Sequence, residues 1–178
     1  MLTVVTSLIA TAVFAFDPPP VGSAAPDFSL TDASGKTHSL SQYKGKTVVL
    51  EWFNPECPFV KKHYGGGNMQ KLQEEYTGKG IVWLTIDSSA PGTEGNLSPE
   101  QAEKIATVWK THQTALLLDP EGKIAYEGAI DSKATPNPAD IPTSTNYVKA
   151  ALDESLTGKP VSNPKTKPYG CSVKYKSS

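Results

Sequence analysis

The chain alternates short apolar runs with polar segments that are rich in glycine and proline. Short continuous apolar runs predict buried strands, and apolar residues spaced three or four apart predict helices. We therefore expect strands at 28–30, 37–40, 47–53, 81–86, 115–118 and 124–130, and helices at 58–64, 68–76, 98–110 and 145–156. Residues 88–97 and 132–143 are predicted to be loops. This order predicts an α/β domain with a central mixed sheet, flanking helices and a small N-terminal β-hairpin.

Composition and charge narrow the class of protein. The chain has 178 residues, 38% of them hydrophobic and 20% charged, which is compatible with one soluble globular domain. Its formal net charge is −1, and the lysines are scattered along the chain rather than clustered. This balance gives no electrostatic reason to expect nucleic acid or an anionic membrane surface as a partner.

The first residues have the pattern of an export signal. Leu2 to Phe16 is apolar, and Val13-Phe14-Ala15 satisfies the small-residue rule for cleavage after Ala15. We therefore expect a signal peptide at 1–15, a domain at 16–158 and a polar tail at 159–178. Such a protein would be periplasmic or secreted, without a stable membrane anchor after cleavage, and would keep its two cysteines in an oxidising compartment.

Cys57 is the residue with the clearest chemical signal. The apolar run before it breaks at Asn54-Pro55, and Pro58 suits the first position of a helix. The sulfur is therefore expected at a strand-to-helix turn, where unpaired N–H groups and the helix dipole favour the thiolate. The thiolate is the reactive form of cysteine, so the position indicates redox or nucleophilic chemistry. The alternative is a small buried apolar residue.

Several segments together resemble the redoxin, or peroxiredoxin-like, branch of the thioredoxin superfamily. They are Ala25–Leu30, Gly45–Leu50, Phe53–Lys61, Gly128–Asp131 and the tail segment Lys167–Lys174. The resemblance implies a thioredoxin-like fold with Cys57 at the position of the nucleophilic cysteine, and no cofactor. It also implies that Glu51, six residues before Cys57, is the buried acid that accepts a proton. The alternative is a carboxylate that reaches water at a strand end or pairs with a lysine.

The chain departs from the patterns of these families at several positions. Val60 stands where thioredoxins have their second cysteine, so a local resolving thiol is missing. Asn54 stands where peroxiredoxins have Thr or Ser, and all 17 basic residues are lysines, so the peroxiredoxin arginine is missing too. Gln113 stands where the fold usually has a cis-proline. Fast peroxidase chemistry is therefore not expected.

Cys171 is the single other cysteine, and its role is open between two alternatives. It either resolves an adduct formed on Cys57 or forms a static disulfide with Cys57 that stabilises the fold. Loop entropy does not oppose either pairing, because it grows only logarithmically with length. Pro58 and Trp52 beside Cys57 are candidate substrate contacts, although Trp52 also suits a core position.

The neighbouring basic residues carry a weaker signal. Lys61 and Lys62 either add positive potential beside the thiolate or are ordinary exposed helix residues. His63 has no second cysteine near Cys57 to complete a ligand set, so no metal site is expected.

Three functions remain open. The first is an exported thiol–disulfide oxidoreductase whose partners are a protein or small-molecule thiol or disulfide and a reducing partner. The second is a slow thiol-dependent peroxidase with an antioxidant role. The third is a non-catalytic binding module with a structural disulfide.

Overall fold

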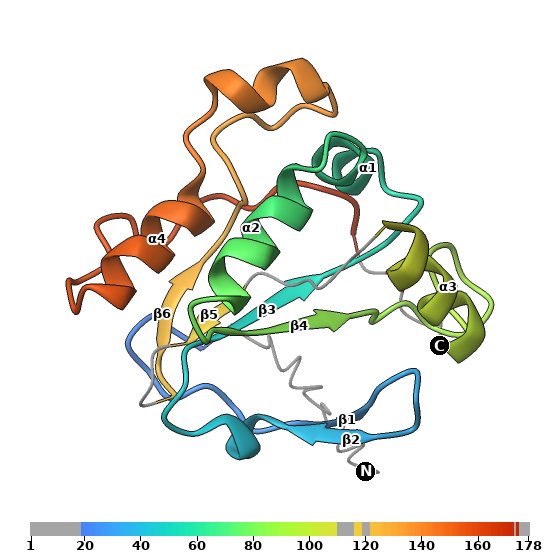
Figure 1. Cartoon of the computed structure of the whole chain (residues 1–178), viewed down its shortest axis with the longest axis horizontal. Helices are drawn as coiled ribbons and strands as arrows, with labels where there is room; N and C mark the ends of the chain where they lie inside the picture. The colour runs from blue at the N-terminus through green and yellow to red at the C-terminus, as the bar shows by residue number, and fades with distance from the viewer. Residues whose placement is uncertain (1–18, 110–115, 119–121, 173, 175–178) are drawn as a thin grey trace, which may run out of the picture.

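The structure is a computed structural model, and it describes residues 19–109, 116–118, 122–172 and 174. Figure 1 shows a sheet with helices beside it and a separate small hairpin below. The strands are β1 (Ser29–Thr31), β2 (Thr37–Ser39), β3 (Val48–Trp52), β4 (Val82–Ile86), β5 (Leu116–Leu118) and β6 (Ile124–Glu127). The α-helices are α1 (Pro58–Gly65), α2 (Asn68–Thr77), α3 (Pro99–Trp109) and α4 (Tyr147–Leu156), and the 3-10 helices are η1 (Leu40–Tyr43) and η2 (Pro138–Thr143).

The central sheet is mixed, as the sequence predicts. Its strand order is β4-β3-β5-β6, in which β3 pairs parallel with β4 and the other two pairings are antiparallel. The strands β1 and β2 form a separate antiparallel hairpin. Because β3 lies inside the sheet and is followed directly by α1, the carboxyl end of β3 is a fixed point for the residues that follow it.

Alternation along β3 divides the core into two parts. Val49 and Phe53 belong to a cluster with the buried residues of α1, α2 and α4, on one face of the sheet. Val48 and Leu50 belong to a second cluster, which residues around η1 and the β1–β2 hairpin cover from the opposite face. Both faces of the sheet are therefore packed, as the continuous apolar run of β3 implies.

The helix α3 begins with a capping box, which the pattern Ser98-Pro99-Glu100-Gln101 predicts. The Ser98 N–H donates to Gln101 Oε1 at 2.8 Å, and the Gln101 N–H donates to Ser98 Oγ at 3.2 Å. One expectation needs correction, because residues 132–143 are not entirely loop: they include η2, whose N-cap Asn137 accepts a hydrogen bond from the Ala139 N–H. The short 3-10 turn leaves no apolar periodicity for sequence reasoning to detect.

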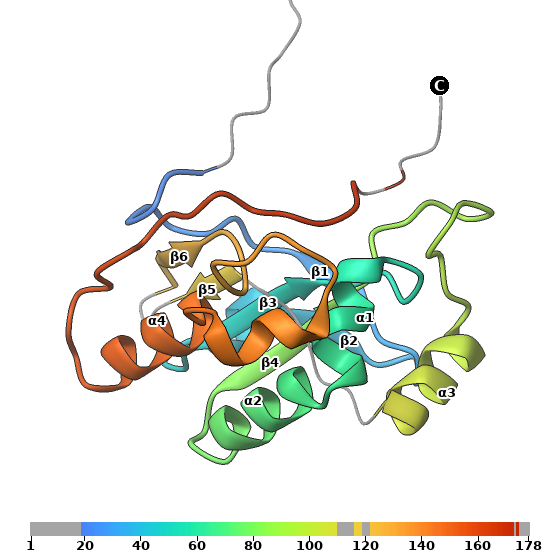
Figure 2. The ribbon, with the colours of Figure 1, turned by 90° about the horizontal axis from the view of Figure 1, so that it is seen from above.

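The tail runs along the domain rather than away from it. Figure 2 shows it passing from the end of α4 beside β6 toward α1.

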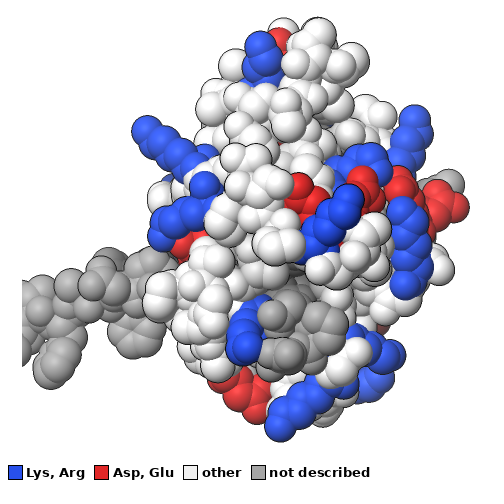
Figure 3. All heavy atoms as spheres, turned by 90° about the vertical axis from the view of Figure 1, so that its left-hand side faces the viewer, with Lys and Arg blue, Asp and Glu red and all other residues white. Residues whose placement is uncertain are grey.

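On the side of the molecule in Figure 3, lysine and acidic side chains are intermixed. No helix in the described part of the chain is long and apolar enough to cross a membrane. The expected signal peptide at 1–15 lies outside the described residues.

Candidate active site

Cys57 lies at the turn between β3 and α1, as predicted. The Phe53 N–H still donates to the carbonyl of Ile86 at 3.0 Å, so the sheet extends one residue past β3. The turn then closes through the Cys57 N–H, which donates to the Asn54 carbonyl at 3.1 Å. Cys57 is the N-cap of α1, with Pro58 in its first turn, and is only 3% exposed.

The surroundings of Cys57 favour its thiolate. Burial by itself would raise the pKa of Cys57, but hydrogen bonds from the Cys171 thiol and from backbone N–H groups outweigh it. These N–H groups belong to Val60, Cys171 and Phe59, and the net effect is a lowered pKa of Cys57. The open amides of the first turn of α1 thus act on the sulfur as the sequence predicts.

Cys171 meets Cys57 although the two residues are far apart in the sequence. Its own side chain is exposed, and neither cysteine is in a disulfide in this structure. The hydrogen bond to Cys57, burial and the nearby Cys57 charge together raise the pKa of Cys171 to about 11. The pair therefore has one thiol that ionises readily and one that keeps its proton while the thiolate faces it.

Glu51 is buried in β3, with only 3% of its surface exposed. Its carboxylate oxygens lie 3.3 and 3.5 Å from the Tyr64 hydroxyl and 3.5 Å from the Trp83 indole nitrogen. These long hydrogen bonds offset little of the cost of burying a charge, so desolvation raises the pKa of Glu51 well above its ordinary value. The expected burial is confirmed, and the proton-accepting role stays a prediction.

A cavity of about 330 Å³ joins the candidate site residues. Glu51, Cys57 and Cys171 all line it, together with apolar side chains from α1 and from the segment after β6. Trp52 also lines the cavity and is 46% exposed, so it can contact a ligand there. Pro58 is exposed at the start of α1 and does not line the cavity, so its predicted substrate contact has no support from the cavity.

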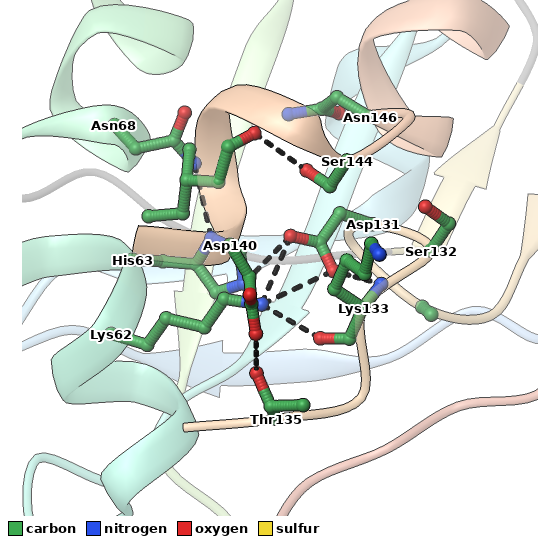
Figure 4. Close-up of polar contacts among 12 residues, drawn as sticks. Lys62, His63, Asn68, Asp131, Ser132, Lys133, Thr135, Asp140, Ser144 and Asn146 are labelled. Atoms are coloured by element: carbon green, nitrogen blue, oxygen red, sulfur yellow. Dashed lines mark hydrogen bonds and ion pairs between the residues drawn. The ribbon is translucent and has the colours of Figure 1, made fainter. Parts of the chain in front are cut away.

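Sequence reasoning missed a buried ionic cluster that lies beside the cavity. We define the anchor cluster as Lys62, His63, Asp131 and Tyr169. The Lys62 ammonium donates to both Asp131 carboxylate oxygens at 3.1 and 3.3 Å and to the Lys133 carbonyl at 2.7 Å. Figure 4 shows Lys62 and His63 extending from α1 toward Asp131. Of the two alternatives for Lys62, the ordinary exposed helix residue is wrong, because its side chain is fully buried.

The charges in the anchor cluster compensate one another. Burial would raise the pKa of Asp131, but hydrogen bonds from Tyr169, the Lys133 N–H and Lys62 outweigh it and leave the pKa lowered. Burial lowers the pKa of His63 to about 4, so this ring is neutral near neutral pH. Asn68 donates to His63 Nδ1 at 3.0 Å, which leaves the proton on Nε2, facing Tyr169.

The tail is attached to the domain on both sides of Cys171. We call residues 164–172 and 174 the C-terminal strap. At one end Glu127 of β6 exchanges backbone hydrogen bonds of 3.0 Å with Pro164 and Thr166. At the other end the Lys174 carbonyl accepts from the Ala90 N–H at 2.8 Å. The polar tail is therefore held against the domain at both ends and is not a free arm in this structure.

Two further expectations concern metal and the cis-proline position. No group of three or more His, Cys, Asp or Glu side chains that could hold a metal ion occurs among the described residues. Gln113, which stands where the fold usually has its cis-proline, lies outside the described part of the chain.

Comparisons with known proteins agree with this geometry. A sequence profile described as the AhpC/TSA family matches residues 21–141. The thiol-disulfide oxidoreductase ResA of Geobacillus kaustophilus is 37% identical over 71 residues, which are 40% of this chain and 40% of that protein. The match thus spans less than half the length of that relative.

Solved structures extend the likeness to nearly the whole chain. An uncharacterized conserved protein from Geobacillus kaustophilus superposes with a TM-score of 0.72 at 27% identity, covering 89% of this chain and 94% of that one. A thioredoxin-family thiol:disulfide interchange protein from Chlorobium tepidum superposes with a TM-score of 0.50 at 16% identity, covering 79% and 99%. The predicted thioredoxin-like fold is confirmed.

Proposed function

Because the chain belongs to the AhpC/TSA family, we propose that it is a thiol–disulfide oxidoreductase with Cys57 as nucleophile and Cys171 as resolving thiol. The observation that carries the proposal is the meeting of the two thiols at the N-terminus of α1, with the pKa of Cys57 lowered and that of Cys171 raised. The similarity to a protein named thiol-disulfide oxidoreductase supports the same reaction class.

The reaction proceeds in two exchanges. The Cys57 thiolate attacks one sulfur of a substrate disulfide, forms a mixed disulfide and releases the other sulfur as a thiolate. Cys171 then loses its proton and attacks the Cys57 sulfur, which forms the Cys57–Cys171 bond and releases the second substrate sulfur. The substrate gains two electrons, and a dithiol reductant returns both cysteines to thiols.

The pKa difference between the cysteines sets the order of these steps. The hydrogen bond to Cys57 and the charge of its thiolate both raise the pKa of Cys171. Neither effect operates once Cys57 is in a mixed disulfide, so Cys171 then ionises more readily. Glu51 lines the same cavity and is the proposed acceptor of the Cys171 proton, because burial raises its pKa well above the ordinary value and makes its carboxylate a stronger base.

A titration in glutathione buffers of defined ratio tests the proposal. Mass spectrometry is expected to detect a Cys57–Cys171 bond whose potential lies well above about −300 mV, as labile disulfides do. Cys171→Ser is expected to trap one glutathionyl group on Cys57, because this variant lacks the thiol that would resolve the mixed disulfide. A bond that resists reduction would instead make the pair a structural staple and the protein a binding module.

A slow thiol peroxidase is the second candidate, and the family match supports it. The position that holds Thr or Ser in peroxiredoxins is Asn54 here. Its side chain accepts from the Glu56 N–H at 2.8 Å and packs against Gly95, so it is engaged in holding the turn. Consumption of hydrogen peroxide faster than exchange with a disulfide, lost in Cys57→Ser, would favour the peroxidase.

Export of the chain, with cleavage after Ala15, is part of the proposal and would place the reaction in the periplasm or outside the cell. The support is the apolar pattern of the first residues. Expression from the native start and N-terminal sequencing test it: a mature chain that begins at Phe16 is expected, and an uncut chain would contradict it.

A further inference from the structure

The attachment of the C-terminal strap near Cys171 depends on one side chain. Among residues 167–170 the side chains of Lys167 and Pro168 are exposed, as is Gly170, and Tyr169 alone is partly buried. Gly170 follows with φ of 134°, a backbone conformation that favours glycine, and Cys171 comes next. On this side of Cys171 the strap is thus held by Tyr169, and on the other side by the Lys174 carbonyl.

Tyr169 enters the anchor cluster and completes its hydrogen bonds. Its hydroxyl donates to Asp131 Oδ1 at 2.5 Å and accepts from His63 Nε2 at 3.0 Å. Its ring lies 5.4 Å from the Phe59 ring, and the Lys62 ammonium lies 5.4 Å from its centroid. Hydrogen bonds to a carboxylate are about twice as strong as neutral ones, so this contact fixes the strap firmly.

The anchor cluster is built into the same helix as the nucleophile. Lys62 and His63 lie in α1, whose N-cap is Cys57. Asp131, which is 2% exposed, connects α1 to the segment after β6 and to the strap. Burying two charges is costly unless further hydrogen bonds satisfy them, and the Tyr169 hydroxyl supplies one of those bonds. The cluster therefore ties the helix of one cysteine to the strap of the other.

We propose that Tyr169 is a positioning residue, which the Lys62–Asp131–His63 cluster holds so that Cys171 faces Cys57. This inference rests on the proposed function, in which Cys171 attacks the sulfur of a Cys57 mixed disulfide. Tyr169 touches no reacting atom in that step. It raises the effective concentration of the Cys171 thiol at Cys57, and so favours the Cys57–Cys171 bond over the mixed disulfide.

The substitution Tyr169→Phe tests the proposal, because it keeps the ring and removes the hydroxyl. Loss of a hydrogen bond to a charged group corresponds to about tenfold or more in an equilibrium constant. We expect the equilibrium constant of the Cys57–Cys171 bond against glutathione to fall about tenfold, which raises the reduction potential by ~30 mV. The pH profile of Cys57 alkylation, followed by mass spectrometry with iodoacetamide, is expected to move to higher pH, because Cys57 loses hydrogen bonds from Cys171.

Tyr76→Phe is the matched control. Like Tyr169, Tyr76 donates its hydroxyl hydrogen to an aspartate, Asp153 Oδ1, at 2.5 Å. Its hydroxyl accepts from the Lys149 ammonium at 3.1 Å, and the contact joins α2 to α4. This variant is expected to keep the wild-type potential and alkylation profile, whatever it does to stability. Equal shifts in both variants would overturn the proposal, because they would mark a general loosening of the fold.

The remaining outcomes separate this inference from the proposed function. A potential and an alkylation profile unchanged in Tyr169→Phe would overturn the positioning role. If the wild-type chain forms no Cys57–Cys171 bond at any glutathione ratio, the proposed function fails, and the alkylation profile alone decides the positioning role. Should Tyr169→Phe not fold, Asp131→Asn removes the same anchor from the opposite side and is expected to shift both readouts in the same direction.

Discussion

The substitution Glu51→Gln is expected to make the protein more stable at neutral pH. Glu51 is 3% exposed, and its nearest hydrogen-bond donors, Tyr64 and Trp83, lie 3.3 to 3.5 Å away. An ionised Glu51 carboxylate therefore destabilises the folded chain, because these few long contacts do not offset its loss of hydration. Glutamine has nearly the same volume and no charge, so it removes this cost without opening a cavity.

The magnitude follows from proton linkage. Burial raises the folded pKa of Glu51 well above 4.5, the value in an unfolded chain. Between these two pKa values the folded state binds the extra proton, so the free energy of unfolding falls as pH rises, by about 1.4 kcal/mol per pH unit. The free energy of unfolding of Glu51→Gln does not fall with pH for this reason. The difference in free energy of unfolding between the variant and wild type should therefore grow by about 1.4 kcal/mol per pH unit and become constant above the folded pKa of Glu51.

Urea unfolding followed by tryptophan fluorescence, at pH 5, 6, 7 and 8, measures this difference. The variant must be compared with wild type at each pH, because the titration of His63 changes the free energy of unfolding with pH in the opposite direction to that of Glu51. Burial lowers the pKa of His63 to about 4, so its contribution to stability is lost as pH falls below about 6.5, equally in both proteins.

The same substitution at the exposed Glu56 controls for the loss of one carboxylate. Stability curves of wild type and Glu51→Gln that stay parallel across this pH range would refute the argument, because Glu51 would then titrate alike in the folded and unfolded chains.

Three further substitutions test how the fold is held together. Gly128→Ala would place a Cβ 2.1 Å from Thr166 Oγ1, so it should detach the strap from β6. We expect urea unfolding to show a free energy of unfolding lower by about 2–3 kcal/mol, and an unchanged value would contradict that packing. Lys62→Met leaves the buried Asp131 carboxylate without its cation and should lower the free energy of unfolding by about 3–5 kcal/mol in the same measurement. An unchanged free energy of unfolding would show that water reaches the ion pair. Ser98→Ala removes a helix cap and should lower stability by about 1 kcal/mol, with no change in Cys57 alkylation.

The Cys57 end of the site was accessible to sequence reasoning because its signals are local. The break after the apolar run and the proline at the first helical position act within a few residues, and they place the sulfur at the start of α1. The position of Glu51 within the same strand indicated burial, with a carboxylate in water at the strand end as the alternative, and the structure shows it buried. The capping box of Ser98 and Gln101 was found for the same reason.

The tail was only partly predictable. Cys171 could be proposed as the partner of Cys57 because the chain has two cysteines, and the structure brings their side chains together. Nothing in the local pattern showed that the strap docks on β6, where Gly128 with φ of 146° admits the close approach of Thr166. A glycine in a sequence is equally typical of a turn, a bulge or the end of a helix, so Gly128 by itself does not indicate a close approach of the tail.

The sequence by itself determined the periodic and local features: the order of strands and helices, the two-sided burial of β3 and the thiol at a helix N-terminus. Only the tertiary structure decided which polar groups meet. Lys62 and Asp131 are 69 residues apart, and His63 and Tyr169 are 106 apart. Hydrophobic periodicity records which face of an element is buried, whereas a pairing between distant charged or polar side chains has no period and depends on how the elements pack.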